Sequence, residues 1–177
     1  GGRDFGPYSQ VTLEIDNGND GSVECWITKN ADSSGGVNFD PEGNWSVQPG
    51  DLVRLFDDQP LPNIKEHIVR YLTLESVDYA SDTLAGKTDP GNPVHVRVMG
   101  PSGNPFLNTV ADGFGNWSVD FSGAFDIVVG SSALVETGDS DGDYTHINWP
   151  VSGFGVVMSI DSTQSLSVGG RGWESGV

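Results

Sequence analysis

Three aspartates at alternate positions are the clearest candidates for chemistry in this chain. Asp139, Asp141 and Asp143 lie in the stretch DSDGDYT. Carboxylates that alternate around a glycine-containing bend can direct their oxygens at one Ca²⁺ ion, which prefers oxygen ligands. The EF-hand pattern stops there, because its sixth position is Tyr144 and its twelfth is Pro150. The stretch therefore predicts either a calcium site completed by ligands from elsewhere in the chain or an Asp-rich hairpin turn.

Tryptophans are the second set of candidates, because an exposed aromatic face can stack on a sugar ring. The chain has five of them. In the run VECWIT, Trp26 alternates with Cys25 and Ile27 and shares its face with Glu24 and Thr28. Strand alternation then puts Trp26 on the outer face, where it could bind a glycan.

The pentapeptide GNWSV occurs twice, at Gly43–Val47 and at Gly115–Val119, and the two copies start 72 residues apart. In both copies the Trp and the Val are two residues apart, so they face the same side of a strand. Trp149 shares a face with Ile147 in the same way. We interpret these tryptophans as core residues, and each pentapeptide as the start of a core strand that marks one domain.

The elements that must position these residues are short strands. Four runs alternate apolar and polar residues with a period of two: QVTLEID, PVHVRVM, NWSVDF and YTHINW. Turn sequences such as DNGNDG, DPGNP and ADGFGN separate them, and no segment has the length and the 3.6-residue period of an amphipathic helix. Many short strands with frequent turns predict an all-β fold made of β-sandwiches.

Composition excludes several classes of function. The formal net charge is −17, which disfavours nucleic acids and anionic membrane surfaces. No apolar run is long enough to cross a bilayer, so we expect no membrane insertion. Cys25 is the only cysteine, so it can form no intrachain disulfide. The chain contains no P-loop, HExxH or serine elbow motif, and its three histidines stand singly, so we expect no enzyme activity.

The repeats predict two tandem Ig-like β-sandwiches, at residues 1–70 and 71–151, with an extra strand in residues 152–177. The stretch VGGRGWESGV near the end resembles GGRDFGPYSQV at the start. We expect residues 152–177 to hold the first strand of a next repeat. We hypothesise that this strand is donated to the first domain of a neighbouring copy, which would lack it. The alternative is a piece cut from a longer covalent array. The residues expected at the assembly interface are Val156, Met158, Ile160 and Trp173.

Longer patterns resemble bacterial Ig-like repeats of large secreted or surface-anchored multidomain proteins. The stretches that carry the resemblance are DTLAG, DGFGNWSVDF and DGDYTHINW. The resemblance implies an extracellular or cell-surface β-sandwich module that acts as stalk, spacer or adhesin. We therefore expect a structural repeat that associates head to tail with copies of itself or with adjacent repeats. A carbohydrate-binding or Ca²⁺-dependent adhesin, whose partners would be surface glycans, is the alternative.

Overall fold

The computed structural model describes residues 2–39, 47–139, 142–150 and 166–170 of the chain. Contacts divide the chain into two units, one built around Gly1–Val69 with Asp139–Tyr144, the other around Arg70–Gly138. The described residues form antiparallel strands and one short 3-10 turn, η1 (Asn17–Asn19), which confirms the predicted all-β fold. None of their helical segments is long and apolar enough to span a membrane. The domain boundaries near residues 70 and 151 stay a prediction.

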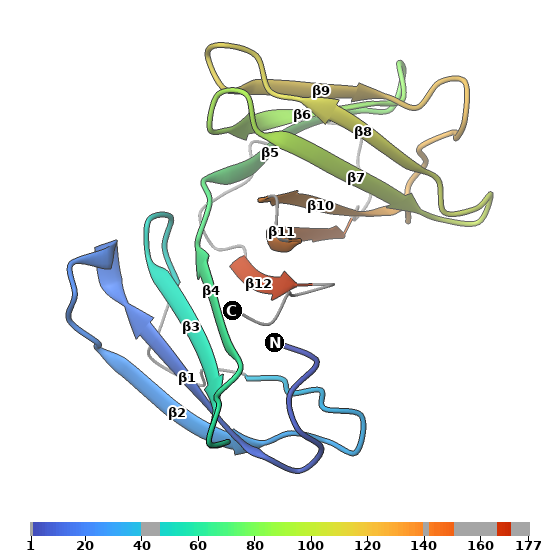
Figure 1. Cartoon of the computed structure of the whole chain (residues 1–177). Coiled ribbons are helices and arrows are strands. Elements are labelled where there is room, and N and C mark those ends of the chain that lie inside the picture. Colours follow the sequence, from blue (N-terminus) through green and yellow to red (C-terminus); the bar gives the residue numbers. More distant parts are fainter. Residues whose placement is uncertain (1, 40–46, 140–141, 151–165, 171–177) are drawn as a thin grey trace. The chain divides into compact units, whose positions relative to one another are not determined.

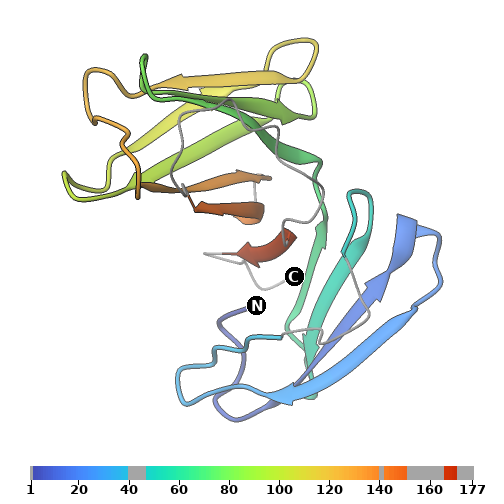
Figure 2. The same ribbon diagram turned by 180° about the vertical axis from the view of Figure 1, so that it is seen from behind.

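One four-stranded antiparallel sheet organises the first unit. Its strands are arranged in the order β2-β1-β3-β4 (Figure 1), and Figure 2 shows them from behind. Their bounds are β1 (Gln10–Asp16), β2 (Cys25–Asn30), β3 (Leu52–Asp57) and β4 (Ile64–Ile68). All three neighbouring pairs are antiparallel.

The core of this unit lies on one face of the sheet, as the period-two pattern predicts. Val11, Leu13 and Ile15 of β1 are all buried, and the intervening residues are partly exposed. Segments outside the sheet cover that face. The covering and adjoining buried side chains are Phe5, Cys25, Ala31, Val37 and Leu55.

Two sheets form the second unit. One has the strand order β5-β6-β9, and the other contains β10-β7-β8 with β11 next to β10 (Figure 1). The final described strand, β12, belongs by its contacts to the first unit. The bounds are β5 (Leu72–Asp78), β6 (Thr83–Thr88), β7 (Pro93–Met99), β8 (Phe106–Val110), β9 (Asn116–Asp120), β10 (Ser132–Gly138), β11 (Asp143–Pro150) and β12 (Leu166–Gly170).

The interior of the second unit confirms the predicted positions of its tryptophans. Trp117 of β9 is 2% exposed and Trp149 of β11 is 7% exposed. Val94, Val96 and Val98 of β7 are fully buried, as their alternation predicts. Trp and Val of the second pentapeptide are therefore core residues rather than a ligand surface.

Equivalent aspartate turns show that the two units repeat one structure. The Oδ1 atom of Asp32 accepts the backbone N–H groups of Ser34 and Gly36, at 2.7 and 2.9 Å. The Oδ1 atom of Asp112 accepts those of Phe114 and Asn116, at 2.8 and 2.9 Å. Each turn then places a glycine in the left-handed region, Gly35 at φ 76° and Gly115 at φ 80°. Asp32 and Asp112 are 80 residues apart, which sets the spacing of the structural repeat.

A second pair of turns has the same spacing and corrects the interpretation of the pentapeptides. Val47 directly precedes the Gln48–Asp51 turn, in which the Asp51 side chain accepts the N–H of Gln48. The matching turn is Val128–Ser131, in which the Ser131 hydroxyl accepts the N–H of Val128. The counterpart of Val47 is therefore Ile127, whereas the second pentapeptide belongs to β9. The two copies are therefore not equivalent positions of the repeat, and residues 43–46 of the first copy lie outside the described residues.

Glycines at matching strand positions are further evidence of the repeat. Gly2 pairs with Val37 as Gly86 pairs with Trp117, and these two partners are also 80 residues apart. A Cβ at Gly86 would overlap the carbonyl oxygen of Thr73 in β5, so only glycine fits there. Gly170 of β12 follows Gly86 at the same interval that separates Gly86 from Gly2, 84 residues. Arg3, Lys87 and Arg171 come directly after the three glycines.

Candidate functional site

The hairpin that joins β10 and β11 contains two of the three aspartates predicted to bind calcium. The backbone N–H of Asp139 donates to the carbonyl of Asp143 at 3.1 Å, and the N–H of Asp143 donates to Asp139 Oδ1 at 3.2 Å. Gly142, at φ 92°, allows the chain to turn back. Asp141 lies outside the described residues. By its contacts the segment Asp139–Tyr144 belongs to the first unit.

His67 of β4 meets this hairpin, although the sequence offers no hint of it. Its Nδ1 atom lies 3.1 Å from Asp139 Oδ2, and the imidazole is almost fully buried. One donor atom from each of His67, Asp139 and Asp143 lies within 4.8 Å of the others. His67 faces inward because Lys65, His67 and Val69 alternate on the buried side of their segment. Seventy-two residues separate His67 from Asp139, so no local motif could reveal the cluster.

A buried lysine adds charge to the same region. Lys65 is 5% exposed, and burial lowers its pKa while the charges of Asp4, Asp143 and Asp57 oppose that shift. Its Nζ lies 3.9 Å from Asp4 Oδ2 and 5.4 Å from the ring centre of Phe5. Asp57 and Asp143 are themselves buried. The first unit therefore places a polar, charged cluster beside its apolar core.

The outer face of the first sheet carries a row of side chains that includes Trp26. Strand pairing places Trp26 opposite Glu14, Glu14 opposite Arg54, and Arg54 opposite Glu66. The guanidinium of Arg54 donates to Glu66 at 2.6 Å and to Glu14 at 3.3 Å. Trp26 is 71% exposed, which confirms that it faces outward. Val23 precedes β2 and is 47% exposed.

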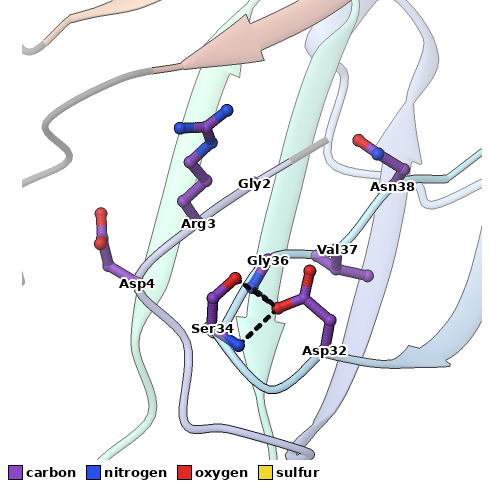
Figure 3. A pocket seen from close by; sticks show the side chains of 8 residues that line it. All are labelled: Gly2, Arg3, Asp4, Asp32, Ser34, Gly36, Val37 and Asn38. Atoms are coloured by element: carbon purple, nitrogen blue, oxygen red, sulfur yellow. Dashed lines mark hydrogen bonds between the residues drawn. The ribbon is translucent and has the colours of Figure 1, made fainter.

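A polar cavity of about 490 Å³ lies beside the Asp32 turn. Its lining comprises residues 2–4 and residues of the 32–38 segment (Figure 3). Asp32 Oδ1 is occupied within the turn, since it also accepts the hydroxyl of Ser34 at 2.7 Å. The Ser34 hydroxyl, followed by the N–H groups of Gly36 and Ser34, lowers the pKa of Asp32. The two backbone contacts recur at Asp112, so they are explained by the turn and require no ligand.

The other two histidines differ in environment. His95 Nδ1 lies 2.7 Å from Asn108 Oδ1, and its ring stacks on Phe106 at 5.8 Å between ring centres. His146 is partly buried, and burial lowers its pKa.

Several predicted site residues fall outside the described residues. Trp45 of the first pentapeptide is one of them. The others are the expected assembly residues Val156, Met158, Ile160 and Trp173.

Comparison with known proteins adds a distant structural similarity. No protein-family model and no curated protein matches the chain. A solved structure described as a "tetra-tandem repeat in extending region of large adhesion protein" is similar at 12% sequence identity and a TM-score of 0.28. The similarity covers 97% of this chain and 43% of that one.

Proposed function

We propose that this chain is a structural repeat module of a cell-surface or extracellular protein of the adhesion type, without enzymatic activity. The observation that carries the proposal is the internal structural repeat, in which Asp32 and Asp112 form the same turn with the same hydrogen bonds. Tandem repetition of one β unit builds an elongated scaffold, because each unit contacts only its neighbours. An acidic surface with net charge −17 keeps such a scaffold soluble.

The proposed mode of assembly is head to tail, by strand addition. In the second unit β6 lies between β5 and β9, and Gly86 of β6 approaches β5 closely. In the first unit, the segment beginning at Gly2 has Val37 on the side that corresponds to β9. We propose that the side corresponding to β5 receives a strand from an adjacent repeat or a second copy, since unpaired strand edges favour such addition.

The repeat interval supports one choice of the strand that would be added. Gly170 of β12 corresponds to Gly86, so the counterparts of Leu72 and Leu74 are Val156 and Met158. Leu72 and Leu74 are buried inward-facing residues of β5. A donated strand would therefore insert Val156 and Met158 into the neighbour's core, with Ile160 next along the strand and Trp173 in the segment beyond it.

Sedimentation velocity over a range of protein concentrations tests the assembly. The full chain should form species whose mass increases in steps of one chain. Met158→Asp should reduce self-association at least tenfold, because it would bury a charge in the acceptor core. Ser159→Asp, one residue further and on the opposite face of the strand, is the matched control and should assemble normally.

Adding the donated strand as a separate peptide gives a second test of strand donation. A peptide spanning residues 153–170 should raise the melting temperature of a chain that ends at residue 152. If the full chain remains monomeric at every concentration and the peptide has no effect, strand donation is wrong. The repeat module would then be a spacer within one covalent chain.

Glycan binding is the second candidate function, and the row on the outer face of the first sheet favours it. Trp26 presents an exposed indole beside the Glu14–Arg54–Glu66 network, which offers charged hydrogen-bonding groups on the same flat face. A glycan array probed with the wild type and with Trp26→Ala tests this function. Glycans that bind the wild type but not Trp26→Ala would support glycan binding at Trp26. If the wild type binds no glycan on the array, this second function is contradicted.

A further inference from the structure

We propose that His67, Asp139 and Asp143 form a site for a divalent transition metal ion of the zinc type. The three residues come from β4 and from the β10–β11 hairpin, and each offers one donor atom within 4.8 Å of the other two. This site differs from the predicted calcium site because it contains an imidazole nitrogen. It does not depend on the proposed assembly.

The geometry fits a tetrahedral ion. Zinc bonds of about 2.0–2.2 Å to nitrogen and oxygen place neighbouring ligand atoms about 3.3 Å apart. The distance from His67 Nδ1 to Asp139 Oδ2 is already 3.1 Å. Asp143 can complete a three-residue set with a small side-chain adjustment, and water can occupy the fourth position next to the partly exposed Asp139 carboxylate.

Charge in the surroundings also indicates a cation. Asp143 and Asp57 are both almost fully buried, and Asp139 is only 22% exposed at its side chain. Lys65 is a buried cation whose charge interacts with Asp143 and Asp57. Buried carboxylates are costly unless positive charge accompanies them. A divalent ion at His67 would add positive charge beside these carboxylates.

The kinds of ligand atom in the cluster favour one class of metal ion. Calcium and magnesium take oxygen ligands, whereas a mixture of imidazole and carboxylate suits zinc and its neighbours in the first transition row. The neutral imidazole must coordinate through Nδ1, the atom that faces Asp139. A coordinating imidazole must be neutral, so acid should weaken the binding of zinc.

Calorimetric titration of the chelator-treated full chain with ZnCl₂, and in parallel with CaCl₂, tests the site. Zinc should bind at one ion per chain and raise the melting temperature, and calcium should bind far more weakly. Cobalt(II) should give the visible absorption of a tetrahedral nitrogen–oxygen site. His67→Gln and Asp139→Asn should each weaken zinc binding by about tenfold or more.

His95→Gln is the matched control, because that imidazole bonds to Asn108 away from the cluster, and it should bind zinc as the wild type does. If His67→Gln fails to fold, Asp139→Asn carries the test, because its carboxylate is partly exposed. Zinc binding that both variants leave unchanged would overturn the proposal. So would the absence of zinc binding, or calcium binding that requires Asp139 but not His67, which would identify the aspartates as an oxygen-only calcium site.

Discussion

Asp32 and Asp112 occupy the same place in two turns that are 80 residues apart. Each carboxylate accepts two backbone N–H groups, from the residues two and four positions later. Each is preceded by a buried alanine, Ala31 or Ala111, and each turn ends in a left-handed glycine. This relationship defines the repeat more reliably than any run of identical letters, because it rests on hydrogen bonds that the backbone must satisfy.

The glycine that closes the second turn should be essential for stability. Gly115 has φ 80°, and a Cβ there would overlap the carbonyl oxygen of Thr88. Gly115→Ala should therefore destabilise the fold by about 1–3 kcal/mol in urea unfolding, as expected for strained backbone. Gly113→Ala is the matched control in the same loop, because a Cβ there meets no atom within 4 Å. Equal stability of the two variants would contradict the turn geometry.

Alanine substitutions at Trp117 and at Trp26 should have very different effects on the free energy of unfolding. Trp117 is 2% exposed, so Trp117→Ala should cost about 3–5 kcal/mol of unfolding free energy. Trp26 is 71% exposed, so Trp26→Ala should change stability by less than about 0.5 kcal/mol. Chemical denaturation followed by circular dichroism measures both. A large loss in Trp26→Ala would show that this ring packs against the protein.

Acid should weaken the aspartate turns. Asn116, through its side chain and then its backbone N–H, and the N–H of Phe114 lower the pKa of Asp112. The folded pKa lies below the unfolded value of about 3.9, so the stabilisation is present above that pH and is lost as the pH falls through the folded pKa. Carboxyl NMR should show Asp112 titrating below an unstructured aspartate, and Asp112→Asn should reduce the slope of melting temperature against pH in that range. A titration midpoint at or above the unstructured value would contradict this.

The single thiol should be protected in the folded state. Cys25 is 3% exposed, and burial raises the pKa of its thiol. Since the thiolate is the reactive form, a disulfide reagent should modify Cys25 slowly in buffer and rapidly in urea. The ratio of the two rates, followed by absorbance, measures local opening of β2. Equal rates in both solvents would mean that this edge strand opens freely.

Local patterns predicted the strands well. The alternation of Val11, Leu13 and Ile15 in β1, and of Val94, Val96 and Val98 in β7, places the same residues inside that the structure buries. The outward position of Trp26 also follows from alternation. Each of these features depends on neighbours two residues away, which the sequence displays directly.

The sequence did not predict the spacing of the structural repeat or the long-range contacts. The identical pentapeptides suggested a spacing of 72 residues, and hydrogen bonds at Asp32 and Asp112 show 80. His67 was taken as a single histidine, yet it lies against Asp139. Inward-facing positions along β4 include Lys65 and His67, polar residues that an apolar pattern cannot identify as buried.

The sequence by itself determined which residues form strands, which faces are apolar and where the chain turns, because these depend on side-chain period and on glycine, proline and aspartate at bends. Only the tertiary structure decided which strands pair, how the two units correspond, and that an imidazole from β4 meets the β10–β11 hairpin. Those contacts join residues far apart in the chain, so they arise from packing and hydrogen bonding that no short stretch of sequence contains.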